Sequence, residues 1–138
     1  MNGIKFKELI VELSNNCNLS CKMCGFGQQK FFFEKFMRFE LFQKVIIEIG
    51  KYATNIRLNG RGESTIHPKF RQMIDYTKNQ CPNSNINLFT NISFRNKQIL
   101  DSFINNDVQL FISIDSPNKE ELENIRIGAN YELIILDV

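Results

Sequence analysis

Residues 9–24 read LIVELSNNCNLSCKMC, a short apolar stretch followed at once by three closely spaced cysteines. Leu9 to Leu13 predicts a β-strand, because the run is short, aliphatic and contains β-branched residues. Cys17, Cys21 and Cys24 then stand in the loop that this strand enters, separated by three and two residues. The sequence therefore places a group of thiols at the carboxyl end of the first strand.

Beyond this loop, strand-like runs alternate with helical apolar stripes. We expect strands at 55–58, 85–90 and 108–114, and helices at 39–49, from Pro68 onward, at 96–106 and at 118–125. Elements in this order require βαβ units and a parallel sheet. The fold class predicted is α/β, a partial (β/α) barrel with parallel strands, truncated after about four βα units. A further apolar element begins at Tyr131, so we expect the front part of a larger barrel or a short version of one.

The helical stripes define the faces that we expect to be buried. They are Phe39, Phe42, Val45, Ile46 and Ile49 in the first helix, Phe70, Met73, Ile74 and Thr77 in the second, and Ile99, Leu100, Phe103 and Ile104 in the third. The strand at 108–114 has almost no polar interruption, which is typical of a strand covered on both faces. Asn118 and Glu121 predict a capping box for the last helix.

Length, composition and charge narrow the class of protein. The 138 residues, 43% of them hydrophobic, support one folded domain or part of one. No apolar run approaches the ~20 residues of a membrane span and no signal peptide opens the chain, so a cytoplasmic location is expected.

The charge is unevenly distributed, since residues 1–69 carry a net charge of +5 and residues 70–138 a net charge of −3. No run of five like charges occurs, so there is no specific nucleic-acid signal. The basic excess around the cysteines suits a bound anion or an acidic electron donor, or is ordinary surface charge.

The clustered thiols favour metal or redox chemistry, because disulfides are disfavoured in a cytosolic protein. A redox pair of Cys21 and Cys24 leaves Cys17 without a role. A structural zinc takes four ligands in spaced pairs, and the only histidine, His67, is far along the chain. Three thiolates from one loop suit a [4Fe–4S] cluster with one iron left open. The fourth cysteine, Cys81, is predicted to be an inert thiol.

Short motifs follow each predicted strand in turn. They are Cys17-x3-Cys21-x2-Cys24 after the first strand, Gly60-Arg-Gly-Glu63 with His67-Pro68 after the second, Thr90-Asn91 after the third, and Ser113-Ile-Asp115 after the fourth, with Arg126 before a glycine. In these motifs and their order the chain resembles the radical S-adenosylmethionine (radical SAM) enzymes, over about residues 9–131. The resemblance implies that residues 1–138 form a radical SAM core domain that is incomplete, without the last barrel strands.

This resemblance also implies a function. Cys17, Cys21 and Cys24 would ligate three irons of a [4Fe–4S] cluster, and S-adenosyl-L-methionine (SAM) would chelate the fourth. The reduced cluster would cleave SAM to a 5′-deoxyadenosyl radical, which abstracts hydrogen from an unknown substrate. An electron donor such as flavodoxin or ferredoxin is implied, and a peptide or small-molecule substrate is favoured.

The resemblance assigns SAM contacts to residues at the four strand ends: Gly60, Gly62, Glu63, Thr90, Asn91, Ser113, Asp115 and Arg126. Ordinary structural roles stay open beside these assignments, such as strand-terminating turns for Thr90 and Asn91 and a solvated helix end for Arg126. No catalytic side chain is predicted, and His67 is expected to be a loop or cap residue. The aromatic residues Phe31 to Phe33 and Phe36 are expected to shield the cluster, or to be ordinary core.

Two other functions fit the sequence. The chain could be a catalytically incompetent fragment or remnant that binds an iron–sulfur cluster, because the fifth and sixth strands of the family are absent. It could also be a zinc-binding structural module, which metal analysis would distinguish from both of the others.

Overall fold

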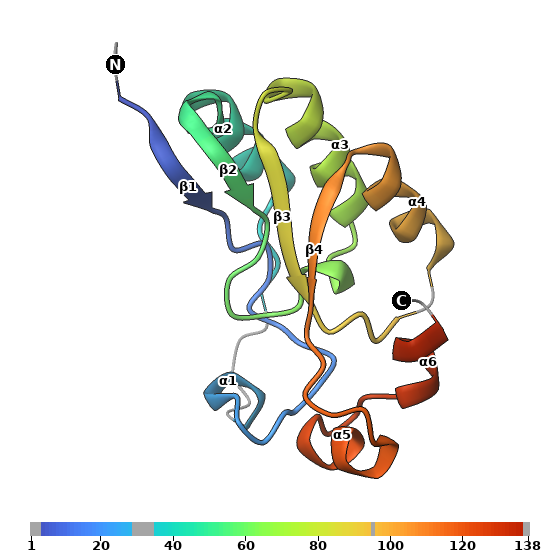
Figure 1. Cartoon of the computed structure of the whole chain (residues 1–138). Helices are drawn as coiled ribbons and strands as arrows, with labels where there is room; N and C mark the ends of the chain where they lie inside the picture. Colours follow the sequence, from blue (N-terminus) through green and yellow to red (C-terminus); the bar gives the residue numbers. More distant parts are fainter. Residues whose placement is uncertain (1–3, 29–34, 95, 137–138) are drawn as a thin grey trace.

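The centre of the protein is a four-stranded parallel sheet in the order β1-β2-β3-β4 (Figure 1). The structure is a computed structural model, and it describes residues 4–28, 35–94 and 96–136. The strands are β1 (Phe6–Ile10), β2 (Ala53–Arg57), β3 (Asn85–Thr90) and β4 (Val108–Ile112). Sequential order and parallel pairing confirm the α/β class and the partial (β/α) barrel predicted from the alternation.

The helices divide into two groups in Figure 1. On one face of the sheet lie α2 (Phe39–Ile49), α3 (Phe70–Gln80) and α4 (Lys97–Asn105), each joining one strand to the next. Beyond the carboxyl ends of the strands lie α1 (Gly25–Gln28), α5 (Lys119–Ile125) and α6 (Tyr131–Leu136). Two short 3₁₀ turns, η1 (Gly50–Tyr52) and η2 (Ser64–Ile66), complete the described elements.

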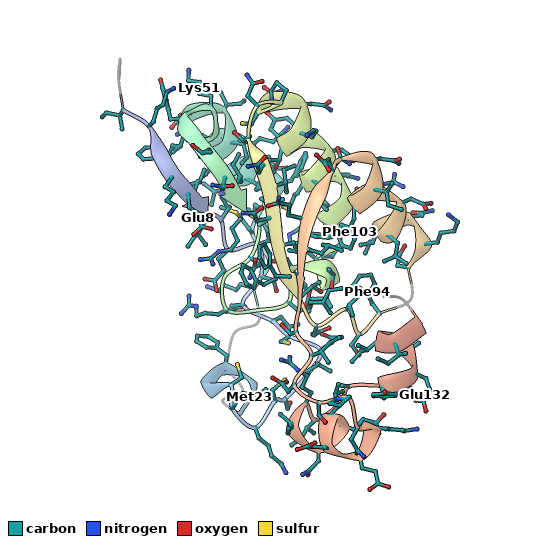
Figure 2. All side chains as sticks on the ribbon, in the orientation of Figure 1. Glu8, Met23, Lys51, Phe94, Phe103 and Glu132 are labelled. Atoms are coloured by element: carbon teal, nitrogen blue, oxygen red, sulfur yellow. The ribbon has the colours of Figure 1, made fainter. Side chains whose placement is uncertain are left out.

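The main core fills the space between the sheet and α2, α3 and α4. The predicted buried face of α3 is confirmed at all four residues, Phe70, Met73, Ile74 and Thr77. In α2 the prediction is confirmed for Phe42 and Ile46, whereas Ile49, the last residue of the helix, is exposed. Phe103, labelled in Figure 2, joins them from α4. These side chains pack on buried strand residues such as Ile56, Ile86 and Leu88. Apolar burial of this kind is the main force that fixes the helices on the sheet.

Three details differ from the sequence-based expectations. The first strand is Phe6–Ile10 rather than 9–13, because pairing with β2 ends at Ile10 whereas the buried residues Val11 and Leu13 continue the core beyond it. The last strand ends at Ile112, and its residues alternate between half-buried and exposed, so within the described chain it is covered on one face only. Ile104 is 79% exposed, because it lies off the face that Phe103 presents to the core.

Asparagine side chains cap the starts of α4 and α5, and the second of these caps was predicted. Asn96 caps α4, since its side chain accepts from the N–H groups of Gln98 and Ile99. Asn118 caps α5 by accepting from the N–H of Glu121. The carboxylate of Glu121 accepts from the hydroxyl of Ser116 instead of reaching back to Asn118, so only half of the capping box forms.

None of the helices in the described ranges combines the length and the apolar character that crossing a bilayer requires.

Candidate functional site

The cysteine loop lies at the carboxyl ends of the strands, where hydrogen bonds tie it to two other segments. The N–H of Glu63, after β2, donates to the carbonyl of Asn16 at 2.8 Å. On the other side, the N–H groups of Ser20 and Lys22 donate to the carbonyls of Ile127 and Ile125 at 2.8 and 2.9 Å. Backbone bonds on both sides therefore fix the course of the loop, because a buried peptide group without a partner is costly.

Gly62 allows the closest approach in the site. A Cβ atom at this position would lie 2.4 Å from the backbone oxygens of both Ser14 and Asn16. At Gly60 a Cβ would lie 2.8 Å from side-chain atoms of Glu12. The two glycines thus let the turn after β2 pack directly on the chain that leads into the cysteines.

Glu63 is a buried hub, 4% exposed, that joins the turns after β2 and β3. Its Oε1 accepts from the N–H and the hydroxyl of Thr65 and from the hydroxyl of Thr90, at 3.2, 2.8 and 3.0 Å. Its Oε2 accepts from the N–H of Asn91 at 2.9 Å. Four donors compensate the burial of the carboxylate, so its side chain holds the two turns together.

Asn91 extends this network to the first cysteine. Its Oδ1 accepts from the N–H of Ser93 at 2.8 Å, and its Nδ2 donates to Oδ1 of Asn18 at 2.9 Å. The same Nδ2 lies 3.9 Å from Sγ of Cys17. The N–H of Leu19 donates to this sulfur as well, at 3.4 Å.

The residue between these contacts, Ile92, has a φ of 47°, in the left-handed region that β-branched residues rarely adopt. Its side chain is 1% exposed and packs with Leu122 and Ile134 in a second, smaller core. The turn after β3 is therefore held in an unfavourable backbone conformation by its surroundings, a feature that is common next to functional sites.

Arg126 reaches the second cysteine from the end of α5. Its side chain is 13% exposed and forms an ion pair with Asp115, which follows β4. Its Nη1 lies 4.0 Å from Sγ of Cys21. The predicted alternative of a solvated helix end is therefore wrong, because the guanidinium is largely buried between a carboxylate and a thiol.

The three thiols differ in exposure. Cys21 is buried, Cys24 is half-buried and Cys17 is exposed as a residue. Burial raises the pKa of the Cys21 thiol, and the nearby Arg126 opposes the rise. Partial desolvation of its sulfur likewise raises the pKa of Cys17, against the hydrogen bond from Leu19. Metal binding would reverse this preference for the thiol form, because a metal-ligating cysteine is deprotonated.

The contact between Glu12 and Arg61, beside the site, was not predicted from the sequence. The carboxylate of Glu12 accepts from Nε, Nη2 and the backbone N–H of Arg61, at 2.9, 2.8 and 2.7 Å. These hydrogen bonds hold the pKa of Glu12 below its ordinary value. The guanidinium of Arg61 also lies 4.8 Å from the ring centre of Phe26 in α1. Glu12 and Arg61 thereby connect the strand ends to the helix that follows the third cysteine.

Other sequence-based expectations concern residues around this site. His67 is buried and caps a turn, since its Nδ1 accepts from the N–H of Lys69 and its Nε2 bonds the carbonyl of Met37. Phe36 packs edge-to-face on His67, and Phe31 to Phe33 lie outside the described residues.

This arrangement agrees with a comparison against known families. The model of the family described as the radical SAM superfamily matches residues 11–135, nearly the whole chain. The chain belongs to the radical SAM superfamily.

Three known proteins illustrate the relationship of this radical SAM chain to others. The tungsten-containing aldehyde ferredoxin oxidoreductase cofactor-modifying protein of Pyrococcus furiosus is 36% identical over 74 residues, 52% of this chain and 20% of that protein. Streptococcus suis SuiB, solved with its precursor peptide SuiA, has a TM-score of 0.81 at 12% identity, over 96% of this chain and 29% of SuiB. The native anSMEcpe structure with bound AdoMet has a TM-score of 0.73 at 21% identity, over 94% of this chain and 38% of anSMEcpe. The chain therefore spans between 20% and 38% of the length of these relatives, and the solved structures share its fold.

The radical SAM site in this chain has the donors that an iron–sulfur cluster requires. Three thiols stand on one braced loop, and N–H groups approach the sulfurs of Cys17 and Cys21. Within residues 4–28, 35–94 and 96–136, no three His, Cys, Asp or Glu side chains converge as they would around a single metal ion. A [4Fe–4S] cluster does not require such convergence, because each thiolate binds a different iron of the cluster.

The structure brings most of the predicted residues of the radical SAM site together. Glu63, Thr90 and Asn91 share one hydrogen-bond network, and Asp115 and Arg126 form another beside Cys21. Ser113 adjoins the first network through its N–H, which donates to the carbonyl of Thr90 at 3.0 Å. Sequence reasoning missed Asn18, Glu12, Arg61 and Phe26, since their contacts span distant parts of the chain. It also missed Thr65, which bonds the carboxylate of Glu63 two residues before it. Asn18 had the signal of standing next to a cysteine.

Proposed function

We propose that this chain binds a [4Fe–4S] cluster through Cys17, Cys21 and Cys24, binds SAM at the open iron, and starts radical chemistry on a substrate. When bound, the cluster and SAM together supply reductive cleavage of SAM and a carbon radical that abstracts hydrogen. Membership of the radical SAM superfamily supports this proposal, as does the AdoMet bound in the anSMEcpe structure. The observation that carries it is the three-cysteine loop braced at the carboxyl ends of four parallel strands.

The contribution of the protein would be to hold the cluster ligands in place and limit their exposure to water. Backbone bonds from Ser20 and Lys22 to the segment after α5 fix one side of the loop, and the bond from Glu63 fixes the other. The thiols would thus be positioned before metal arrives, which lowers the entropy lost on binding.

The proposed SAM contacts are Gly60, Gly62, Glu63, Thr90, Asn91, Ser113, Asp115 and Arg126. The Glu63 carboxylate already accepts four hydrogen bonds, from Thr65, Thr90 and Asn91. We therefore assign the contact with SAM to the backbone of this turn and a supporting role to the Glu63 side chain. Backbone carbonyls of the turn at Gly60 to Glu63 would accept from the amino group of SAM, and the Glu63 side chain would keep that turn in shape. Ser113 would face the cofactor from the end of β4.

The remaining parts of the proposal concern partners and location. We propose that the chain is the front part of a radical SAM core domain, acts in the cytoplasm, and receives electrons from a flavodoxin or ferredoxin. A peptide substrate is favoured because SuiB, which has the same fold, was solved with a precursor peptide. A small molecule is the other class, because the Pyrococcus furiosus relative is named as a cofactor-modifying protein.

Anaerobic reconstitution tests the proposal. The purified chain is expected to bind about four irons and four sulfides, and to give a [4Fe–4S] EPR signal after reduction that changes when SAM is added. With dithionite and SAM it is expected to release 5′-deoxyadenosine. Cys21→Ala should lose the cluster, whereas Cys81→Ala, in a thiol buried in the core away from the loop, is the matched control. Iron-free protein under all reconstitution conditions would refute the proposal, and one zinc per chain would support a structural module instead.

A second candidate is binding of the cluster without catalysis. The observation that favours it is that the hydrogen bonds described above brace the cysteine loop, which cluster binding requires whether or not SAM is cleaved. Cluster assembly without any release of 5′-deoxyadenosine would support this second function.

A further inference from the structure

Two of the three thiols are approached by side-chain donors from distant parts of the chain. Asn91 lies 74 residues from Cys17, and Arg126 lies 105 residues from Cys21. The backbone of the loop is bonded to neighbouring segments without either donor. Their placement against sulfur therefore calls for its own explanation.

The orientation of the Asn91 amide is determined by its partners. Because the N–H of Ser93 is a donor, the oxygen of Asn91 must face it, which directs the NH₂ group to the other side. One of its two hydrogens satisfies Oδ1 of Asn18, and the other faces Sγ of Cys17. Asn91 is 6% exposed as a residue, so water competes little for this donor.

Arg126 is placed equally firmly. Its Nε faces the carboxylate of Asp115, and its Nη1 faces the sulfur of Cys21. The ion pair and the thiol thus share one guanidinium, which is largely shielded from solvent. Cys21 therefore has the positive charge of Arg126 beside it, and the negative charge of Asp115 partly offsets that charge.

We propose that Asn91 and Arg126 tune the reduction potential of the cluster by donating to the sulfurs of Cys17 and Cys21, and that Asp115 moderates the effect of Arg126. This inference rests on the proposed function, since it concerns the cluster that the three cysteines would hold. Asn91 and Arg126 act here as positioning residues, whatever further contact they make with SAM.

The direction of the effect follows from charge. Reduction adds one electron to the cluster, so hydrogen-bond donors and positive charge near the sulfurs favour the reduced state and raise the potential. A carboxylate nearby has the opposite effect. Because Asn91 and the side chain of Arg126 are mostly buried, solvent screens these donors less than it would at the surface.

Variants of the ion pair give effects of opposite sign. Arg126→Gln removes the cation and leaves Asp115 unpaired, so the potential is expected to fall; Asp115→Asn leaves the cation unpaired, so it is expected to rise. Each change should shift the ratio of reduced to oxidised cluster at a fixed potential by about tenfold, because hydrogen bonds to charged groups are strong. Arg126→Lys keeps the charge and should lie close to wild type.

The measurement is an EPR-monitored redox titration of the reconstituted full chain without SAM, which removes any contribution from SAM binding. If the ion pair only ordered the loop, the two variants would change the potential in the same direction or leave it unchanged, and either result overturns the inference. If Arg126→Gln fails to assemble a cluster, a rise in Asp115→Asn supports the inference and no rise overturns it.

The variant Asn91→Asp tests the role of Asn91 independently of the ion pair. It keeps the acceptor for Ser93 but replaces the donor that faces Cys17 with a carboxylate oxygen, so the potential is expected to fall by a similar amount. An unchanged potential would overturn the assignment for Asn91. Failure of the proposed function would look different, because wild-type protein would then hold no iron–sulfur cluster at all.

Discussion

The backbone N–H of Asn91 donates to Oε2 of Glu63 at 2.9 Å, so the turn after β3 is bonded to the turn after β2 inside the protein. Both residues are nearly inaccessible to solvent, at 6% and 4%. The contact joins two motifs that lie 28 residues apart and places Asn91 beside the first cysteine. A glutamate that looks like a cofactor contact in the sequence therefore also holds the site together.

Glu63→Gln is expected to lower the free energy of unfolding by about 1–3 kcal/mol. A glutamine keeps the shape but replaces one acceptor oxygen with an NH₂ group, which would face either Asn91 or the hydroxyls of Thr65 and Thr90. Urea denaturation measures the effect. Glu12→Gln is the control, since its partner Arg61 is exposed and such pairs contribute less than about 1 kcal/mol. Equal stability of Glu63→Gln and wild type would contradict the structural role.

The two glycines after β2 are expected to respond differently to alanine. Gly62→Ala places a methyl group 2.4 Å from backbone oxygens of Ser14 and Asn16, which cannot rotate away. We expect a loss of about 3 kcal/mol and poor cluster assembly, measured by urea denaturation and iron content. Gly60→Ala contacts only the side chain of Glu12, so its cost should be smaller.

A double variant checks the reason for this difference. Adding Glu12→Gly removes the Cβ, Cγ and Cδ atoms that the new methyl group would meet, so Gly60→Ala/Glu12→Gly should be about as stable as Glu12→Gly alone. If Gly60→Ala were the more damaging of the two glycine variants, the packing argument would be wrong.

Gly50 and Cys81 form a second close contact, in the main core. A Cβ at Gly50 would lie 2.7 Å from Sγ of Cys81, and the helical φ of −53° at Gly50 suits alanine. Gly50→Ala should therefore cost about 1–3 kcal/mol through overpacking alone. Cys81→Ala should cost about 1 kcal/mol by leaving a small cavity. The double variant should be less destabilised than the sum, because the methyl group takes the place of the sulfur; additive losses in denaturant melts would count against this contact.

The helices and β3 could be predicted because periodicity reports burial directly. Phe70, Met73, Ile74 and Thr77 recur at helical spacing, and all four are buried. The first strand was predicted too far along the chain, because Val11 and Leu13 are buried after the last residue that pairs with β2, Ile10, which is itself exposed. Burial and strand pairing are different properties, and apolarity indicates only the first.

The sequence predicted which residues gather at the candidate site but not how they contact one another. The cysteine spacing and the motifs at the strand ends selected residues that the structure brings close together, since local sequence patterns place them at the ends of neighbouring strands. The bonds from Glu63 to Asn91 and from Arg126 to Asp115 depend on how distant turns meet. The left-handed Ile92 is also beyond local rules, because a β-branched residue adopts that conformation only when the surroundings require it.

His67 is expected to make stability depend on pH. Burial lowers the pKa of His67, with the nearby Lys69 acting in the same direction and the bond to the carbonyl of Met37 opposing them. The unfolded chain binds a proton at the ordinary value of about 6.5, whereas the folded chain resists it, so the unfolded state binds more protons as the pH falls below that value. Protonation would also turn Nδ1 from an acceptor into a donor that faces the N–H of Lys69.

The stabilisation by neutral His67 is therefore present above about pH 6.5 and is lost as the pH falls through the folded pKa. Urea denaturation of wild type and His67→Gln at pH 7.5, 6.5 and 5.5 checks this. Wild type should be the more stable at pH 7.5, by about 1 kcal/mol from its two buried hydrogen bonds, and the difference should shrink toward pH 5.5. Comparing the two proteins cancels the carboxylates, which titrate in both. A difference that stays constant or grows on acidification would show that His67 is not held neutral by its burial.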